Sequence, residues 1–228
     1  MVKFVLLDLD DTILDFHKAE AIALRGTFQE LGLQSTDEIV ARYSEINSRQ
    51  WQLLELGRLT REEILTRRFT LLFREFGIDC TGEKAQAIYE RRLGIGHYFM
   101  PGAEALLDAL YGKYEMYVVS NGTAAVQDSR IKSAGIARYF GGIFVSQRVG
   151  HDKPAREFFD ACFSRIPGFD REKAVIIGDS LTSDIQGGIN AGIRTVWYNY
   201  RHKPAGANIV PDYETDSLYS IPPLLERI

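Results

Sequence analysis

Hydrophobic and polar positions change abruptly at the start of the chain, where four consecutive apolar residues, 4–7, run directly into Asp8, Asp10 and Asp11. A short unbroken apolar run is typical of a strand buried on both faces, as in a parallel sheet. Ligands of open α/β sheets bind beyond the carboxyl ends of the strands, so these carboxylates lie where chemistry is expected. Packed together in a crevice, they would repel one another unless a cation lies among them or one of them holds a proton. Taken alone, an Asp-x-Asp sequence is as typical of a polar turn as of a functional site.

The long stretch of residues 16–96 carries apolar side chains at helical spacing and no pattern typical of a strand. It divides into four helical segments. The second begins after Thr36, the third begins with a capping box from Thr60 to Glu63, and the fourth spans 81–93. We interpret the apolar positions as the core of an all-helical unit.

From Pro101 onward, helical and strand patterns alternate. The expected order is helix 103–111, strand 116–119, helix 124–134, strand 142–146, helix 155–165, strand 174–177, helix 185–191 and strand 194–198. Such alternation favours parallel pairing through right-handed crossovers, so strand 4–7 joins a sheet formed by the later part of the chain. We therefore predict an α/β protein with a doubly wound, Rossmann-like, five-stranded parallel sheet. Its core domain comprises residues 1–15 and 97–228, and an all-α helical cap domain, residues 16–96, is inserted where insertions often act as lids.

Composition narrows the class of protein further. The 228 residues are 45% hydrophobic, which is enough for a full core. Twenty-seven basic residues against 31 acidic ones give a net charge of -4, which argues against a nucleic-acid polymer or an anionic membrane as partner. Cys80 and Cys162 suit no metal spacing, and no apolar run approaches the roughly 20 residues of a membrane span. We therefore expect a cytoplasmic protein with free thiols, either a monomer or a homodimer.

Further polar signals follow the expected strands at Ser120-Asn121, at Lys153 and at the pair Asp179 and Asp184. The hydroxyl of Ser120 suits a helix N-cap and equally, with the N–H groups of the helix start, a cradle for a phosphoryl oxygen. Lys153, followed by Pro154 as the expected first residue of a helix, is in isolation typical of a solvated surface residue. A carboxylate at Asp184 also suits the dipole of the helix that begins there.

Taken in order, these segments resemble the four motifs of the haloacid dehalogenase superfamily of phosphotransferases. The matching motifs are Asp-x-Asp-x-Thr at 8–12, Ser-Asn-Gly at 120–122, Lys-Pro at 153–154 and Gly-Asp-x-x-x-x-Asp at 178–184. The resemblance covers the whole chain, because the helical stretch is similar to the cap that this superfamily inserts after its first strand.

The resemblance implies a catalytic role for the residues of the first motifs. Asp8 would be the nucleophile that attacks phosphorus, and Asp10 the general acid and base. Ser120, Asn121 and Lys153 would hold the phosphoryl group. A second acid two residues after the nucleophile suits this division, because it can protonate the leaving alcohol and later take a proton from water.

The resemblance also implies a bound Mg2+ as cofactor. Its ligands would be Asp8, the main-chain carbonyl of Asp10, and Asp179, while Thr12 and Asp184 would support the site and Asp184 would orient the lysine. The four carboxylates are expected to converge, and a phosphate dianion approaching them meets strong repulsion. Mg2+, which prefers oxygen ligands, and a lysine would balance that charge.

Several details narrow the reaction. The acid at Asp10 argues against true dehalogenases, which lack an acid/base there and need no Mg2+, and Thr12 is similar to phosphatases and phosphomutases rather than to ATPase pumps. The detailed sequence of the core motifs resembles the bacterial pyrimidine 5′-nucleotidase branch. Three segments of the cap resemble that branch as well: Trp51, residues 55–57 and residues 68–69. The resemblance thus implies an Mg2+-dependent phosphatase of small phosphorylated metabolites, with pyrimidine nucleoside 5′-monophosphates as the expected substrates.

Other functions stay open. A sugar-phosphate phosphatase of the phosphoglycolate type, or a phosphomutase, would have the same core motifs. A phospho-acceptor signalling domain would carry its Asp at the end of a middle strand, whereas those strands are expected here to end in Ser120 and Ser146. A carboxylate–metal nuclease is disfavoured by the lack of basic surface.

The cap is expected to choose the substrate, because the core motifs bind only phosphate and metal. The candidates are Trp51, whose ring suits stacking on a base as well as packing in the cap core, and Arg58, in the turn between two helices.

Overall fold

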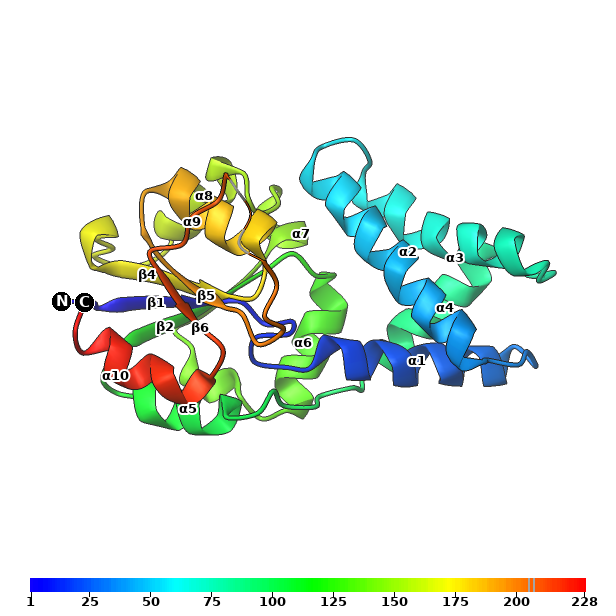
Figure 1. The fold of residues 1–228 in the computed structure, drawn as a ribbon, viewed down its shortest axis with the longest axis horizontal. Helices are drawn as coiled ribbons and strands as arrows, with labels where there is room; N and C mark the ends of the chain where they lie inside the picture. The colour runs from blue at the N-terminus through cyan, green and yellow to red at the C-terminus, as the bar shows by residue number, and fades with distance from the viewer. Residues whose placement is uncertain (205, 207) are drawn as a thin grey trace.

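The computed structural model describes residues 1–204, 206 and 208–228, and Figure 1 shows a sheet flanked by helices beside a separate group of helices. Six strands form one sheet in the order β3-β2-β1-β4-β5-β6, and every neighbouring pair is parallel. The strands are β1 (Phe4–Leu7), β2 (Glu115–Ser120), β3 (Gly142–Val145), β4 (Ala174–Gly178), β5 (Arg194–Tyr198) and β6 (Tyr213–Thr215). The predicted α/β class and the parallel sheet are confirmed.

The sheet has one strand more than the five predicted. β6 has three residues, none of them fully buried, so its sequence carries no apolar run that would predict a strand. It is fixed beside β5 by Asp212, whose carboxylate accepts hydrogen bonds from the backbone N–H and the hydroxyl of Thr195 at 2.8 and 2.9 Å. β6 pairs with β5 along its backbone, and this contact between a side chain and a distant backbone helps to fix the pairing.

β1 is buried on both faces because it lies in the middle of the sheet. Val5 and Leu7 belong to the apolar cluster on one face, which helices α5 (Ala103–Leu110), α6 (Ala124–Ser133) and α10 (Ile221–Leu225) complete. Phe4 and Leu6 belong to the cluster on the other face, beneath α8 (Arg156–Phe163) and α9 (Gln186–Ala191). Figure 1 shows that β1 runs from the end of the molecule that holds both termini toward the separate group of helices.

That group consists of α1 (Phe16–Glu30), α2 (Asp37–Glu55), α3 (Arg61–Phe76) and α4 (Gly82–Leu93). Their starts are set by the expected side chains. Thr36 and Thr81 accept hydrogen bonds from the first turns of α2 and α4, and Thr60 with Glu63 forms the capping box of α3. The predicted helices are confirmed, whereas the division into a core and a cap of residues 16–96 stays a prediction.

The interior of the four helices contains a chain of polar side chains that hydropathy alone did not predict. Each helix contributes one buried residue: Glu20, Asn47, Arg68 and Gln86. Asn47 donates to Glu20 at 2.7 Å, and Arg68 donates to Asn47 at 2.7 Å and to Gln86 at 2.8 Å. Burial raises the pKa of Glu20. Because buried polar groups need their partners, this chain favours one arrangement of the four helices over others.

The helix after Lys153 begins later than predicted. α8 starts at Arg156, one residue after the start of the predicted helix 155–165 and two after Pro154, because Lys153 is fixed by its backbone before the helix begins. The side-chain amide of Asn121 donates to the carbonyl of Lys153 and accepts from its N–H, both at 2.8 Å. Ala155 then has an extended backbone, and helical geometry begins only after it.

The remaining helical segments are short: α7 (Ser146–Val149) and the turns Ala137–Tyr139, Arg171–Lys173, Leu181–Ile185 and Leu218–Ser220. Among the described residues, no helix is both long and apolar enough to cross a membrane.

Candidate active site

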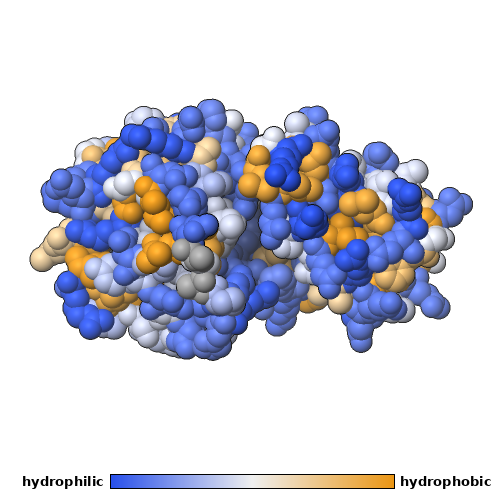
Figure 2. Space-filling model, turned by 45° about the horizontal axis from the view of Figure 1, so that its top comes forward, coloured by the Kyte–Doolittle hydropathy of each residue, from blue (hydrophilic) through white to orange (hydrophobic). Residues whose placement is uncertain are grey.

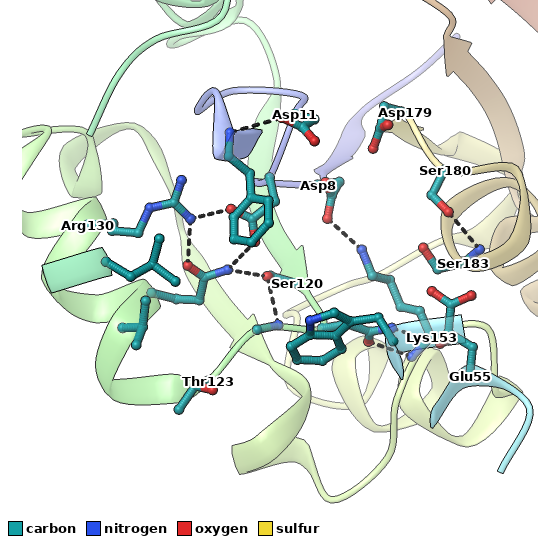
Figure 3. A pocket seen from close by; sticks show the side chains of 18 of the residues that line it. Asp8, Asp11, Glu55, Ser120, Thr123, Arg130, Lys153, Asp179, Ser180 and Ser183 are labelled. Carbon is teal, nitrogen blue, oxygen red and sulfur yellow. Dashed lines mark hydrogen bonds and ion pairs between the residues drawn. The ribbon is translucent and has the colours of Figure 1, made fainter. Parts of the chain in front are cut away.

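The polar residues that follow β1, β2 and β4 meet at the edge of the sheet that faces α1–α4. β1 has β2 on one side and β4 on the other, so the strand order reverses here, which is where α/β sheets bind ligands. A cavity lies at this edge, lined by Asp8, Ser120 and Asp179 from the core and by Trp51 and Glu55 from α2. Figure 2 shows the molecule hollowed between its two parts, and Figure 3 shows the cavity from close by.

Lys153 lies at the centre of this site, with its side chain almost completely buried. Its Nζ donates hydrogen bonds to Asp8 Oδ1 at 2.7 Å, to Asp184 Oδ1 at 2.6 Å and to the carbonyl of Val119 at 2.7 Å. Burial by itself would lower the pKa of Lys153, but the two carboxylates raise it overall, so the ammonium stays charged. The lysine is therefore a buried ion-pair partner and not a solvated surface residue, and Figure 3 shows it pointing at Asp8.

Asp8, Asp179 and Asp184 form a compact acidic cluster, in which one carboxylate oxygen of each lies within 4.8 Å of the other two. Burial raises the pKa of Asp8 well above its usual value, and neighbouring carboxylates raise it further although Lys153 opposes them. Burial also raises the pKa of Asp179 to about 7. Clustered carboxylate oxygens with an excess of negative charge are the donor set that Mg2+ prefers. The residues present therefore fit a hard divalent cation.

Asp184 supports this cluster. Its Oδ1 accepts from Lys153, and its Oδ2 accepts from the N–H of Ser180 at 3.1 Å. Because both oxygens already accept hydrogen bonds, Asp8 and Asp179 are the better placed of the three to bind a cation. The packing also requires Gly178, where a Cβ atom would lie 2.2 Å from Asp184 Oδ2.

The side chain of Asp10 is bound by residues of α6. Of the four carboxylates that we expected to converge, three therefore form the cluster, and that of Asp10 lies apart from them. Asp10 accepts from Gln127 Nε2 at 2.6 Å and forms an ion pair with Arg130. Gln127 Nε2 also donates to Ser120 Oγ at 2.8 Å and thereby links two predicted site residues. Sequence reasoning missed Gln127 and Arg130. The available signal was their i, i+3 spacing on the helix that follows Ser120, which places both on one face.

Ser120, which ends β2, and Asn121, which follows it, have different contacts. Ser120 lines the cavity, and its Oγ accepts a hydrogen bond from the N–H of Gly122 at 3.2 Å. The side chain of Asn121, which we expected on the phosphoryl group, is bound to the backbone of Lys153 instead. We therefore assign this side chain to positioning the lysine.

Thr12 and Asp11 belong to the segment after β1, and Asp11 lines the cavity whereas Thr12 does not. Thr12 is buried, and its hydroxyl has no hydrogen-bond partner among the described residues. Asp11 has a positive φ of 58°, and its Oδ1 accepts from the N–H of Phe16 at 2.9 Å. Its Oδ2 pairs with His17 Nε2 at 2.9 Å. Asp11 thus fixes the start of α1, where the chain leaves the sheet.

The turn between α2 and α3 reaches the core through the residues on either side of it. Glu55 accepts from Thr182 Oγ1 at 2.8 Å, and Arg61 donates to core loops. Burial raises the pKa of Glu55 to about 7.

Trp51 lines the cavity, as a specificity residue must, whereas Arg58 is exposed and is not among the lining residues. The position of Arg58 therefore does not support its expected role in specificity, because a turn places its own side chains outward.

The sequence model of the haloacid dehalogenase-like hydrolase family matches residues 5–198. The chain therefore belongs to this family, and the predicted resemblance is confirmed. The crystal structure of the HAD-hydrolase YfnB from Bacillus subtilis, bound to magnesium, has a TM-score of 0.94 to this structure, with 40% identity and 98% of each chain covered.

Two further relatives are similar over nearly their full length. The pyrimidine 5′-nucleotidase PynA of Streptococcus pneumoniae is 38% identical over 225 residues, which cover 98% of this chain and 94% of PynA. The pyrimidine 5′-nucleotidase YjjG of Escherichia coli is 28% identical over 222 residues, 97% of each chain.

The strand argument against a signalling domain is wrong. β1, which leads into Asp8, is itself a central strand, paired with β2 on one side and β4 on the other. The position of Asp8 in the sheet is therefore compatible with either class of protein. The match to a hydrolase family separates them.

Proposed function

We propose that the protein is a phosphomonoester hydrolase in which Asp8 forms a covalent phosphoaspartyl intermediate. The observation that carries this proposal is the contact between Asp8 and the buried ammonium of Lys153 at the end of a central strand. A carboxylate attacks only when it is ionised, and phosphoryl oxygens need positive charge beside them. Lys153 favours both conditions, since it stays charged and lies against the nucleophile.

The reaction then runs in two displacements. In the first, a carboxylate oxygen of Asp8 bonds to phosphorus, the bond to the ester oxygen breaks, and that oxygen takes a proton from Asp10. In the second, water attacks phosphorus, Asp10 takes its proton, and the bond from Asp8 to phosphorus breaks. Inorganic phosphate leaves, and both aspartates return to their starting states. Gln127 and Arg130 contact the two carboxylate oxygens of Asp10 and position it, and one of these contacts opens when Asp10 carries the proton.

We further propose that Mg2+ is the cofactor, held by Asp8, Asp179 and the main-chain carbonyl of Asp10, with Asp184 in support. When bound, it would supply the positive charge that offsets the acidic cluster and the phosphoryl oxygens. The donor set of the cluster supports this, as does the magnesium bound to the relative YfnB.

Residues 16–96 would act as the cap that selects the leaving group, and we propose pyrimidine nucleoside 5′-monophosphates as substrates. The two nucleotidase relatives support this choice. So does the cavity, because the apolar side chains of Phe16, Leu65, Leu93 and Val126 line it together with polar ones. Interdomain movement is a property of the YfnB crystal structure and supports a cap that opens and closes.

Phosphate release from a panel of phosphorylated metabolites, with Mg2+ present, tests this function. We expect UMP and dTMP to be hydrolysed over many turnovers and in preference to purine nucleotides and sugar phosphates. A preference for a sugar phosphate would overturn the nucleotidase assignment. Transfer to a second sugar hydroxyl without phosphate release would indicate a phosphomutase, and a single turnover that stops at phosphorylated protein would indicate a signalling domain.

A further inference from the structure

We propose that Arg61 is a positioning residue that joins the cap to both loops of the phosphoryl site, so that closing the cap and ordering these loops are one event. The catalytic consequence rests on the proposed function, whereas the structural part rests on the contacts of Arg61 itself.

Arg61 is the first residue of α3, and its guanidinium group enters the core. Nη1 donates to the carbonyl oxygens of Asn121 at 2.8 Å and of Gly122 at 3.1 Å. Nη2 donates to Ser146 Oγ at 2.6 Å and pairs with the carboxylate of Asp152. Only 12% of the side chain remains exposed. One guanidinium thus joins the loop after β2, the residue that follows β3, and the loop that precedes the buried lysine.

The surroundings of this group suit arginine specifically. Its acceptors lie in three separate segments, and a planar fork with five N–H donors can serve them together where a single ammonium cannot. The guanidinium also packs on the ring of Trp51, with Cζ 5.4 Å from the ring centre. Trp51 and Arg61 lie on α2 and α3, so the contact fixes these helices to each other as well as to the core.

The contacts of Arg61 lead directly to the phosphoryl site. Asn121 follows Ser120, and Asp152 precedes Lys153 in the chain. The side chain of Asn121 is in turn bound to the backbone of Lys153 at both its N–H and its carbonyl. Arg61 therefore fixes the two segments that carry the proposed phosphate-binding side chains.

A second contact lies on the other side of the same turn. Glu55, at the end of α2, accepts from Thr182 in the loop after β4. The turn between α2 and α3 thus touches the loops after β2, β3 and β4, and Arg61 supplies the contacts to the first two. Loss of Arg61 should remove the contacts of this turn with those loops and leave its contact at Glu55.

The test compares wild-type protein with R61A, R61K and the matched control R67A, since Arg67 is an exposed arginine on the same helix. Small-angle X-ray scattering measures compactness without ligand and with Mg2+ and orthovanadate. Steady-state kinetics with UMP and with ribose 5-phosphate give kcat/KM. Circular dichroism and thermal unfolding show that each variant is folded.

We expect R61A to have a larger radius of gyration than wild type and to lose about 10- to 100-fold in kcat/KM for both substrates, the loss typical of charged buried hydrogen bonds. R61K should be intermediate and R67A unchanged. In a D152N background, R61A should lose less than it does alone, because one of its partners is already weakened.

Equal compactness and activity of R61A and wild type would overturn the proposal. Loss of activity with unchanged compactness would also overturn it, because Arg61 would then act on the substrate directly. If wild-type protein hydrolyses no phosphomonoester, the proposed function fails, while the scattering comparison still decides whether Arg61 closes the cap.

Discussion

Arg130 and Asp10 form an ion pair in which the guanidinium is completely buried and 27% of the aspartate side chain is exposed. Arg130 Nε also donates to the carbonyl of Gly96 at 2.9 Å, and its Cζ lies 5.8 Å from the centre of the Phe16 ring. Phe16 begins α1, and Gly96 follows α4. One buried arginine therefore contacts the proposed acid/base and both connections between the sheet and the four helices.

This relationship predicts that Arg130 is needed for both stability and turnover. Arg130→Met keeps most of the volume but leaves Asp10 without its buried partner. We expect the free energy of unfolding, measured in urea titrations, to fall by about 2–4 kcal/mol. The loss should be smaller than for an ion pair whose two members are both fully buried, because Asp10 is partly exposed. We also expect kcat to fall by about 10- to 100-fold. Lys132→Met, at an exposed position of α6, is the control. If Asp10→Asn and Arg130→Met had fully additive effects on kcat, the proposed coupling would be wrong.

The assignment of Asp8 as nucleophile is tested by Asp8→Asn. The amide has nearly the same shape but carries no negative charge, so turnover should fall by about 10³-fold or more. Mass spectrometry must exclude deamidation back to aspartate. Retention of more than a tenth of the wild-type turnover would remove Asp8 from this role. Asp10→Asn should also be strongly impaired, because both proton transfers are lost.

The sequence predicted most of what lies along single elements. The β1 run, the capping residues Thr36 and Thr60 and the polar ends of the strands follow from local periodicity and side-chain chemistry, and the structure has each of them. The structure also brings Asp8 and Lys153 into contact, although 145 positions separate them, and only the family resemblance had placed both residues at one phosphoryl site.

What could not be predicted depends on contacts between elements. No sequence pattern singled out Arg61 or Arg130, and only the packed structure shows that both side chains are largely buried against the core. The sequence identifies the turn between α2 and α3 but not the direction of its side chains, so it does not distinguish the exposed Arg58 from Arg61, which enters the core. β6 was not predicted because it has no apolar run, and its pairing with β5 and the contact of Asp212 with that strand appear only in the structure.

Metal removal should abolish activity and lower thermal stability. The acidic cluster of Asp8, Asp179 and Asp184 is left with excess negative charge without a cation. Exhaustive chelation should therefore stop turnover, and added Mg2+ should restore it and raise the melting temperature by mass action. Asp179→Asn should weaken Mg2+ binding, measured by calorimetry, more than Asp184→Asn does. Undiminished activity after chelation would contradict a metal-dependent reaction.

The raised pKa of Glu55 predicts that the stability of the metal-free protein depends on pH. Burial raises its pKa to about 7 in the folded state, from an ordinary value near 4.5. The folded state therefore binds the proton more tightly than the unfolded state, so the contribution of Glu55 to stability is present below pH of about 4.5 and is lost as pH rises toward 7.

Glu55→Gln removes this titration. The difference in unfolding free energy between Glu55→Gln and wild type should shift in favour of the variant from pH 5 to pH 8, by about 1 kcal/mol or more, and then level off. Glu62→Gln, at an exposed position of α3, serves as control. A difference that stays constant over this range would show that Glu55 titrates normally.

We expect opposite results from substituting Trp51 and Arg58, the two residues that the sequence suggested for substrate specificity. Trp51 lines the cavity and packs on Arg61, whereas Arg58 is exposed outside it. If the indole stacks on the base, Trp51→Ala should raise KM for UMP by about 10-fold, since stacking of an aromatic ring on a base contributes roughly 1–3 kcal/mol. Ribose 5-phosphate, which lacks the base, should be little affected, and Arg58→Ala should change neither substrate.

The ratio between the two substrates separates the two ways in which Trp51 can act. A loss confined to UMP places the indole against the base. Equal losses on UMP and ribose 5-phosphate would instead show that Trp51 acts through Arg61, because a cap that closes poorly impairs every substrate alike. Trp51→Phe refines this choice, since the smaller ring keeps an aromatic face for the base. It should therefore recover a large part of the affinity for UMP if stacking is the cause.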